Sequence, residues 1–272
     1  MTVVAGEVMA RLVERLAEAG WVAPDIEAGA VMEAARCLAP TPAEVEVVAE
    51  RIAARRLGGE PLEHITGQVD FAGLRLVIGP GVYVPRAQTE PLALEAAARL
   101  ASSAPPRRAL DVGTGCGAVA AVLAQVDGAE VVATDVDPLA LAWARRNAAV
   151  HRFEVIASDL FADVPPAYRG GLGVVTACLP YVPSGAMEYL PRDVLAHEPT
   201  GALCGGDDGL ALVRRLIDGA AQWLAPAGWL LAEIGADQGT LCLEQLARAG
   251  FTDYRVVYDD EGDARRVEGR LA

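Results

Sequence analysis

The chain has 272 residues and a formal net charge of −14, and 53% of its residues are hydrophobic although only 5% are aromatic. That length suits one large α/β domain with a smaller domain beside it, and the hydrophobic content excludes a disordered chain. Because proteins that bind nucleic-acid backbones carry basic surfaces, the negative charge argues against direct nucleic-acid binding and favours a small molecule or a protein as the partner.

The cysteines and the first residues indicate a soluble protein of the reducing cytoplasm. The five cysteines are odd in number, widely spaced and free of any C-x-x-C pair, so neither a disulfide framework nor a metal site is predicted. Charged residues such as Glu7 and Arg11 interrupt the apolar core that a signal peptide would need. No later apolar run reaches the length of a membrane span, and we expect no membrane partner.

Residues 1–68 are predicted to form a small helical domain that recognises the substrate. Apolar residues recur there at helical spacing, as Val8, Leu12 and Leu16 do. Residues 69–88 are rich in glycine and contain short β-like runs, which predicts a β-hairpin that links the domains.

Residues 89–272 alternate between strand and helix patterns. The expected strands are Arg108–Val112, Glu130–Asp135, Phe153–Ala157, Val174–Cys178, Trp229–Ile234 and Tyr254–Tyr258. The expected helices are Ala118–Gln125, Leu139–Val150, Leu210–Trp223 and Gly239–Ala249. Such alternation predicts a doubly wound, mainly parallel α/β sheet that binds its ligand at the carboxyl ends of the strands.

A glycine-rich loop follows the first expected strand of this domain. Its three glycines allow a tight turn and a close approach of the backbone to a ligand at the start of the next helix. The residues of this segment that we expect at the cofactor are Asp111, Gly113, Thr114, Gly115, Cys116 and Gly117. By itself the loop also fits a dinucleotide site or an ordinary turn between a strand and a helix.

Acidic residues end the next two expected strands. Asp135 ends the first, where a carboxylate can accept hydrogen bonds from both hydroxyls of a ribose. Asp137 and Pro138 look like the cap and the first residue of the following helix, which leaves Asp135 for the ligand. Asp159 follows the second and is predicted to receive an adenine amino group, unless it is a solvated loop residue.

Together these strand ends resemble the class I S-adenosylmethionine-dependent methyltransferases, whose Asp-x-Gly-x-Gly-x-Gly loop is matched by residues 111–117. The resemblance implies a Rossmann-like sheet of seven strands, S-adenosylmethionine as cofactor and S-adenosylhomocysteine as product. A nicotinamide cofactor fits less well, because the loop reads G-T-G-C-G rather than G-x-G-x-x-G. Leu160 stands where family members often place an aromatic residue over adenine, and leucine can cover the ring with less stacking.

Further segments, spread over almost the whole chain, resemble the HemK/PrmC family of protein-glutamine N5 methyltransferases. They are Arg55–Leu62, Ile65–Gly67, Pro80–Arg86, Glu198–Pro199, Gly206–Leu210 and Asp259–Val267. Members of that family act on peptide-chain release factors or a ribosomal protein. The resemblance therefore implies a release-factor-like protein substrate and methyl transfer to a glutamine amide.

The motif that binds the acceptor amide in this family is altered here. Family members read Asn-Pro-Pro-Tyr, and the corresponding residues are Cys178, Leu179, Pro180 and Tyr181. In the family the asparagine oxygen and a proline carbonyl take the two amide hydrogens, whereas a thiol is only a weak donor and acceptor. The resemblance implies catalytic roles for Cys178, Pro180 and Tyr181, substrate contacts for all four residues, a cofactor contact for Cys178, and an altered acceptor specificity.

Two other positions bear on the acceptor. The family usually has Pro-Glu where this chain has Ala87 and Gln88. His197 ends the proline-containing loop that starts at Val182, and it is predicted to bind substrate, although a surface histidine is the alternative.

The sequence leaves several functions open. The first is a HemK-like methyltransferase with a changed acceptor, and the second keeps the cofactor for small-molecule, secondary-metabolite tailoring with a small-molecule acceptor. The third is a non-catalytic module that binds a protein through its helical domain. A nucleophilic role for Cys178 is disfavoured because no histidine lies near it in sequence.

Overall fold

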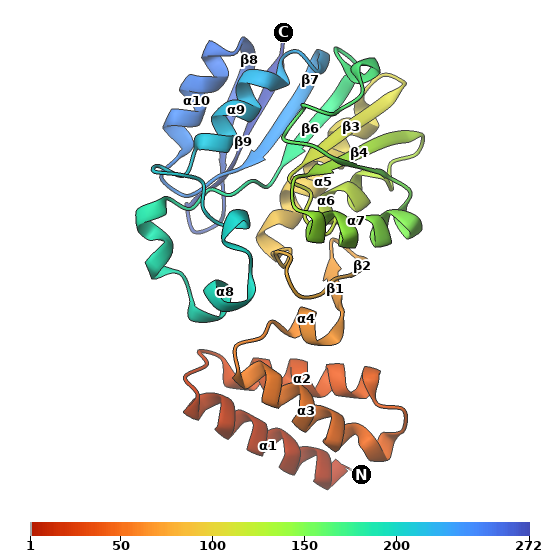
Figure 1. The fold of residues 1–272 in the computed structure, drawn as a ribbon, viewed down its shortest axis with the longest axis vertical. Coiled ribbons are helices and arrows are strands. Elements are labelled where there is room, and N and C mark those ends of the chain that lie inside the picture. Colours follow the sequence, from red (N-terminus) through yellow and green to blue (C-terminus); the bar gives the residue numbers. More distant parts are fainter. Residues whose placement is uncertain (1) are drawn as a thin grey trace. The chain divides into compact units, whose positions relative to one another are not determined.

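The computed structural model describes residues 2–272 and separates the chain into two compact units. The helical unit comprises Met1–Gln68 and Pro191–His197, and the sheet unit comprises Val69–Leu190 and Glu198–Ala272 (Figure 1). The sequence pattern gave no sign that residues 191–197 group with the amino-terminal helices. Over residues 2–272, none of the helices combines the length and apolar character that crossing a bilayer requires.

The helical unit is built from α1 (Thr2–Glu18), α2 (Pro24–Leu38), η1 (Pro42–Glu44), α3 (Val45–Leu57), α4 (Leu62–Thr66) and α8 (Arg192–His197). One apolar stripe from each of the first three α-helices forms its core, as the helical spacing predicts; examples are Leu12, Val31 and Ile52. Arg56 crosses from α3 to α2, where its guanidinium bonds both carboxylate oxygens of Glu27 at 2.9 Å. The same group lies 3.8 Å from the ring centre of Trp21, which adds a cation–π contact.

The sheet unit contains the remaining elements. In chain order they are β1 (Gln68–Phe71), β2 (Leu74–Val77), η2 (Ala87–Thr89), α5 (Glu90–Ser102), β3 (Arg107–Val112), α6 (Ala118–Leu123), β4 (Ala129–Asp135), α7 (Pro138–His151), β5 (Glu154–Ala157), η3 (Pro166–Tyr168), β6 (Leu172–Ala177), η4 (Ser184–Tyr189), η5 (Thr200–Ala202), α9 (Ala211–Ala220), β7 (Leu224–Glu233), α10 (Gly239–Arg248), β8 (Phe251–Tyr258) and β9 (Ala264–Leu271). Strands β1 and β2 form the expected hairpin, but it ends at Val77, well before residue 88. Its turn residues Ala72 and Gly73 both have positive φ, as a tight type I′ turn requires.

The main sheet has seven strands in the order β5-β4-β3-β6-β7-β9-β8, which confirms the doubly wound fold. Strands β3 to β7 are parallel, whereas β9 runs antiparallel to both β7 and β8. Strand β9 was not predicted, because its arginines and Glu268 hide the strand pattern. Strand β7 starts five residues earlier than its apolar run, at Leu224 rather than Trp229, and passes through Ala227 with a positive φ.

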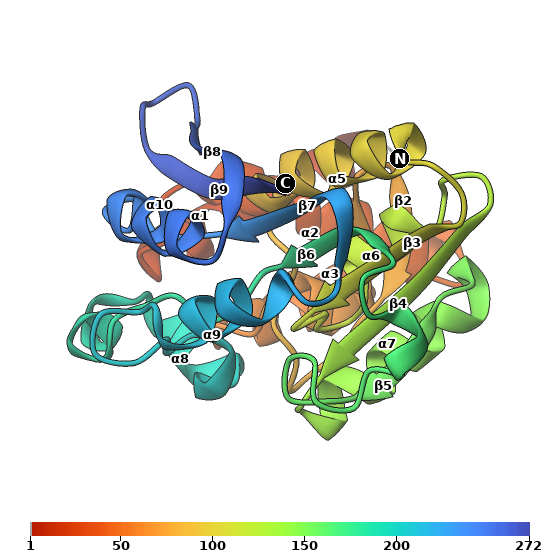
Figure 2. The same ribbon diagram turned by 90° about the horizontal axis from the view of Figure 1, so that it is seen from above.

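Helices cover both faces of this sheet (Figure 2). Neighbouring residues of the central strands alternate between two apolar cores: Ala109 and Val174 pack with α5 and α6, whereas Leu110 and Val175 pack with α9 and α10. Because both faces are buried, the strands read as continuous apolar runs, which is why the sequence showed them clearly. Sheets of this class bind their ligands at the carboxyl ends of the strands.

A buried carboxylate stabilises the part of the sheet where β9 lies between β7 and β8. The Glu268 side chain is 0% exposed and accepts from Arg99 at 3.0 Å, Arg255 at 2.8 Å and Arg266 at 2.9 Å. Arg99 also lies 3.4 Å from the ring centre of Trp229. These contacts tie α5, β7, β8 and β9 together.

Replacing Glu268 by alanine should destabilise the fold strongly, because Arg99 and Arg266, whose side chains are only 15% and 13% exposed, lose the carboxylate that pairs with them. We expect a loss of about 3–5 kcal/mol in the free energy of unfolding, measured by urea titration. The control Glu130→Ala breaks an exposed pair with Arg108 and should cost less than about 1 kcal/mol. Equal losses in the two variants would contradict this account of the buried cluster.

Candidate functional site

The carboxyl ends of the parallel strands bring most of the predicted site residues together. The register pairs Val112 of β3 with Thr134 of β4 and with Ala177 of β6, and pairs Ala177 with Ala232 of β7. The loops after these strands therefore leave the same edge of the sheet. The connections diverge between β3 and β6, which is where open α/β sheets bind their ligands.

Asp111 fixes the glycine loop from beneath. Its buried carboxylate accepts from Thr114 Oγ1 at 2.6 Å, from Thr176 Oγ1 at 2.8 Å and from the backbone N–H of Ala120 at 3.2 Å. Burial raises the pKa of this carboxyl to about 6, although the hydrogen bonds oppose the shift. These bonds all go to the protein, so a direct contact of Asp111 or Thr114 with a cofactor stays a prediction.

The glycines of the loop have two different tasks. A Cβ atom on Gly113 would lie 2.7 Å from Leu179 Cδ2, and one on Gly117 would lie 2.6 Å from Phe153 Cζ, so both positions pack against neighbours. Gly115 has a φ of +57°, and no atom lies within 4 Å of where its Cβ would be, so no protein atom covers its backbone on that side. Cys116 points inward, and burial raises the pKa of its thiol to about 12.

Asp135 connects this loop to β4. Its Oδ2 accepts from the Gly115 N–H at 2.9 Å and its Oδ1 from the Asp137 N–H at 2.9 Å. Burial raises its pKa, which is the cost of holding a charge there. Each oxygen keeps a lone pair for a further donor, so the carboxylate fits a pair of hydroxyl groups. Asp137 caps α7 by accepting from Leu139 N at 2.8 Å, which confirms the predicted cap, while the contact of Asp135 with a ribose stays a prediction.

The structure places Asp159 and Leu160 directly after β5, as their order in the chain requires. The Asp159 side chain is 54% exposed and pairs with Arg215 at 2.8 Å, so a ligand would have to share or replace that partner. Leu160 is buried with a φ of +54°, and it contributes to one of the two apolar cores. Their adenine contacts stay predictions.

The Cys178–Tyr181 loop follows β6 and is held from behind. The Gln238 amide nitrogen donates to the Tyr181 carbonyl at 2.8 Å and to the Asp208 carbonyl at 3.1 Å, while its oxygen accepts from Gly235 N at 2.7 Å. Leu179 is buried against Gly113, and Pro180 is half-buried. The acceptor loop therefore has a defined position beside the glycine loop.

A buried carboxylate that the sequence analysis missed lies at the centre of this side. Glu233 ends β7, is 4% exposed, and accepts from Thr89 Oγ1 at 2.7 Å and from the Tyr181 hydroxyl at 3.1 Å. The Gln88 amide nitrogen lies 3.5 Å from the same carboxylate and 3.4 Å from the Tyr181 oxygen. An acid at the end of an apolar strand is the signal that identified Asp135, and it was available for Glu233 as well.

Cys178 lies beside this carboxylate, because the sheet register pairs the preceding residues, Ala177 and Ala232. Burial, followed by the charge of Glu233, raises the pKa of Cys178 well above its ordinary value. Burial and Glu233 also raise the pKa of Tyr181. Both groups therefore stay protonated at neutral pH, which argues against a nucleophilic thiolate.

His197 belongs to the helical unit. Its Nε2 lies 3.4 Å from the carbonyl oxygen of Gly58, and both residues are part of that unit. The predicted contact of His197 with substrate stays a prediction.

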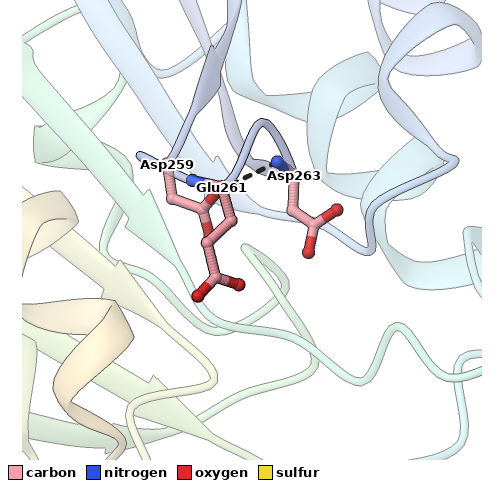
Figure 3. A group of neighbouring side chains, drawn as sticks. All are labelled: Asp259, Glu261 and Asp263. Atoms are coloured by element: carbon pink, nitrogen blue, oxygen red, sulfur yellow. Dashed lines mark hydrogen bonds between the residues drawn. The ribbon is translucent and has the colours of Figure 1, made fainter.

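An acidic group lies on the turn between β8 and β9 (Figure 3). Oxygen atoms of Asp259, Glu261 and Asp263 lie within 4.8 Å of one another. However, Asp259 Oδ1 accepts from the backbone N–H groups of Glu261 and Asp263, and Oδ2 accepts from Arg265 at 2.6 Å. These bonds shape the turn and account for the position of Asp259 without a metal ion.

A surface hollow of about 470 Å³ lies at the opposite end of the strands. It is lined by residues 124–129, just before and at the start of β4, and by Val150, His151 and Arg152 at the end of α7. Because ligands of such sheets bind at the carboxyl ends, this hollow is not part of the site.

The chain is similar to known methyltransferases in sequence. Residues 94–169 match the family model "Methyltransferase small domain". The release factor glutamine methyltransferase of Geobacter sulfurreducens is 37% identical over 223 residues, which cover 81% of this chain and 76% of the relative. The protein of the same name from Neisseria gonorrhoeae is 37% identical over 232 residues, covering 84% and 83% of the two chains.

Solved structures agree with the fold. The ribosomal protein L11 methylase of Lactobacillus delbrueckii subsp. bulgaricus matches with a TM-score of 0.51 at 19% identity, over 72% of this chain and 84% of that one. A methyltransferase from Pyrococcus furiosus matches with a TM-score of 0.51 at 20% identity, over 73% and 89%.

The raised pKa of Asp111 predicts a pH-dependent stability. Its carboxyl loses its proton near pH 3.8 in the unfolded chain but near pH 6 in the folded protein, so ionisation favours unfolding between these values. The stability advantage of wild type over Asp111→Asn should therefore fall by about 2 kcal/mol as the pH rises from 4 to 7.5. Urea titrations at both pH values measure it.

The control is Asp127→Asn, which removes one carboxylate from an exposed position before β4. It corrects for the change in net charge. If Asp111→Asn and Asp127→Asn showed the same pH dependence, the account of the buried carboxyl would be wrong.

Proposed function

Because the chain belongs to the HemK/PrmC family of release factor glutamine methyltransferases, we propose that it methylates a side-chain amide nitrogen of glutamine in a release-factor protein. It is an S-adenosylmethionine-dependent methyltransferase. The observation that carries the finer proposal is the position of the Cys178–Tyr181 loop beside the Gly115–Asp135 contact, at one edge of the sheet. Membership of an enzyme family argues against the non-catalytic alternative.

The residues at the glycine loop fit S-adenosylmethionine. The bare backbone of Gly115 leaves room for a ligand, and Asp135 has lone pairs directed to hydroxyl donors, as a ribose needs. We assign the ribose to Asp135 and the adenine to Asp159 and Leu160. When bound, the cofactor supplies a sulfonium methyl group that a nucleophile can accept.

The acceptor side has to compensate for the poor nucleophilicity of an amide nitrogen, whose lone pair is delocalised into the carbonyl. Holding both amide hydrogens aims the nitrogen and lowers the entropic cost of the reaction. The hydrogen-bonded pair of Tyr181 and Glu233 provides polar groups that can hold the amide, but the thiol of Cys178 is only a weak acceptor. We therefore propose an altered acceptor specificity, with a weaker selection for the standard glutamine.

Methyl transfer can be measured directly. Wild-type protein, methyl-labelled S-adenosylmethionine and release factors purified without methylation are incubated, and label at the glutamine is read by mass spectrometry. Incorporation at the glutamine nitrogen is the expected result. Binding of the cofactor without any incorporation would overturn the glutamine assignment and favour a small-molecule acceptor, such as an amine or alcohol.

Replacing Asp135 by alanine should weaken S-adenosylmethionine binding at least about 100-fold, because two hydrogen bonds to a charged group are lost, each worth about 1.5 kcal/mol or more. Isothermal titration calorimetry measures the affinity. Asp137→Ala is the matched control: it removes the cap of α7 two residues away and should bind the cofactor nearly as well as wild type. Unchanged affinity in Asp135→Ala would refute the ribose assignment.

Replacing Cys178 by asparagine should raise the rate of glutamine methylation about tenfold. The new amide group would stand beside Glu233, to which its NH2 can donate, and would leave its oxygen to accept a substrate N–H. Steady-state kinetics on the release factor measure the effect. Cys178→Ala removes the thiol without adding a carboxamide and should give no gain. A gain in both variants, or in neither, would count against the role of the carboxamide.

A further inference from the structure

Two residues in which this chain departs from its family meet at one carboxylate. Cys178 lies beside Glu233, because the sheet register pairs the residues before them, Ala177 and Ala232, and Gln88 approaches the same carboxylate through its side-chain amide. They come from distant parts of the sequence, the loop after β6 and the η2 turn. The position that lost a carboxamide therefore lies close to one that has one.

The chemistry of its neighbours fixes how the Gln88 amide is turned. Its side-chain nitrogen lies 3.5 Å from Glu233 Oε1 and 3.4 Å from the hydroxyl oxygen of Tyr181. A carboxylate only accepts, so the NH2 group has to face Glu233 and the carbonyl oxygen is directed away from it. Among residues 2–272, none donates a hydrogen bond to this oxygen.

Hydrogen bonds hold the Glu233 carboxylate in place. Thr89, the next residue, is buried and donates to Glu233 Oε2 at 2.7 Å, and the Tyr181 hydroxyl donates to Oε1 at 3.1 Å. The Gln88 side chain itself is exposed, so a substrate can reach it from solvent. A neutral amide oxygen is a much better hydrogen-bond acceptor than a thiol.

Resting on the proposed function, we propose that the Gln88 carbonyl oxygen accepts an N–H of the methyl acceptor, and so supplies the amide recognition that Cys178 lacks. Glu233 and Tyr181 orient the group through its NH2. The site selects primary amides over alcohols, because an amide NH2 can donate one hydrogen to this oxygen and still has a second to lose on methylation, whereas an alcohol has a single O–H hydrogen. Gln88 is thus an acceptor-binding residue.

The test uses the full-length protein and four variants: Gln88→Ala, Cys178→Asn, the double variant, and Gln125→Ala as the matched control. Gln125 is an exposed glutamine after α6, at the opposite end of the strands. Two quantities are measured for each protein: kcat and KM for methylation of unmethylated release factor, and the Kd of that release factor for the protein loaded with S-adenosylhomocysteine. Calorimetry with S-adenosylmethionine checks that each variant is folded and binds cofactor.

We expect Gln88→Ala to lower kcat/KM about tenfold and to weaken release-factor binding, with cofactor affinity unchanged. Gln125→Ala should match wild type. The gain in kcat/KM from Cys178→Asn should be about five times larger in the Gln88→Ala background than in wild type. In wild type Gln88 already supplies a carboxamide oxygen, whereas in Gln88→Ala the new asparagine has to supply it.

Equal activity and binding in Gln88→Ala and Gln125→Ala would overturn the inference while leaving the proposed function standing. An equal gain from Cys178→Asn in both backgrounds would also overturn it, since the two groups would then act independently. If wild type methylates no glutamine, the proposed function fails, and the binding comparison still decides the inference: weaker release-factor binding by Gln88→Ala supports it, and equal binding refutes it.

Discussion

The buried carboxylate of Asp111 holds the two sides of the site in register. It accepts from Thr114 in the glycine loop, from the start of α6 and from Thr176 on β6, so the proposed cofactor loop and the strand that leads to the proposed acceptor loop are bound to the same group. Burying this charge is costly, as its raised pKa indicates, and its three donors offset that cost. Displacing the loop would also displace Leu179, which packs against Gly113.

A second buried carboxylate, Glu233, organises the acceptor side in the same manner. Its carboxylate accepts from Thr89 in the segment before α5 and from Tyr181 in the loop after β6. The Gln88 amide lies 3.5 Å from it, and Cys178 lies beside it, directly after the neighbouring strand β6. The proposed donor and acceptor sides are thus each held by a buried carboxylate, Asp111 on β3 and Glu233 on β7, with β6 between these two strands. Having cysteine at position 178 changes one side chain of this site and leaves the hydrogen bonds of Glu233 with Thr89 and Tyr181 in place.

Local patterns in the sequence predicted the cofactor side, while the acceptor side needed the fold. The glycine loop, Asp135 and the Asp137 cap are read from residues close together in the chain, and the structure places them as expected. Glu233 meets Thr89 and Gln88 only because β7 lies near the start of α5, across more than a hundred residues, which no local pattern encodes. Strand β9 was missed for a related reason: Glu268 is buried in the sheet because it pairs with Arg99 of α5 and Arg255 of β8 as well as with Arg266 of its own strand.

A crystal structure of the protein with S-adenosylhomocysteine tests most directly that methyl donor and acceptor meet at this edge of the sheet. The account predicts both ribose hydroxyls on the Asp135 carboxylate and the sulfur atom directed at the loop of Cys178 and Tyr181. A ligand whose ribose lies away from Asp135, or whose sulfur points away from that loop, would contradict it.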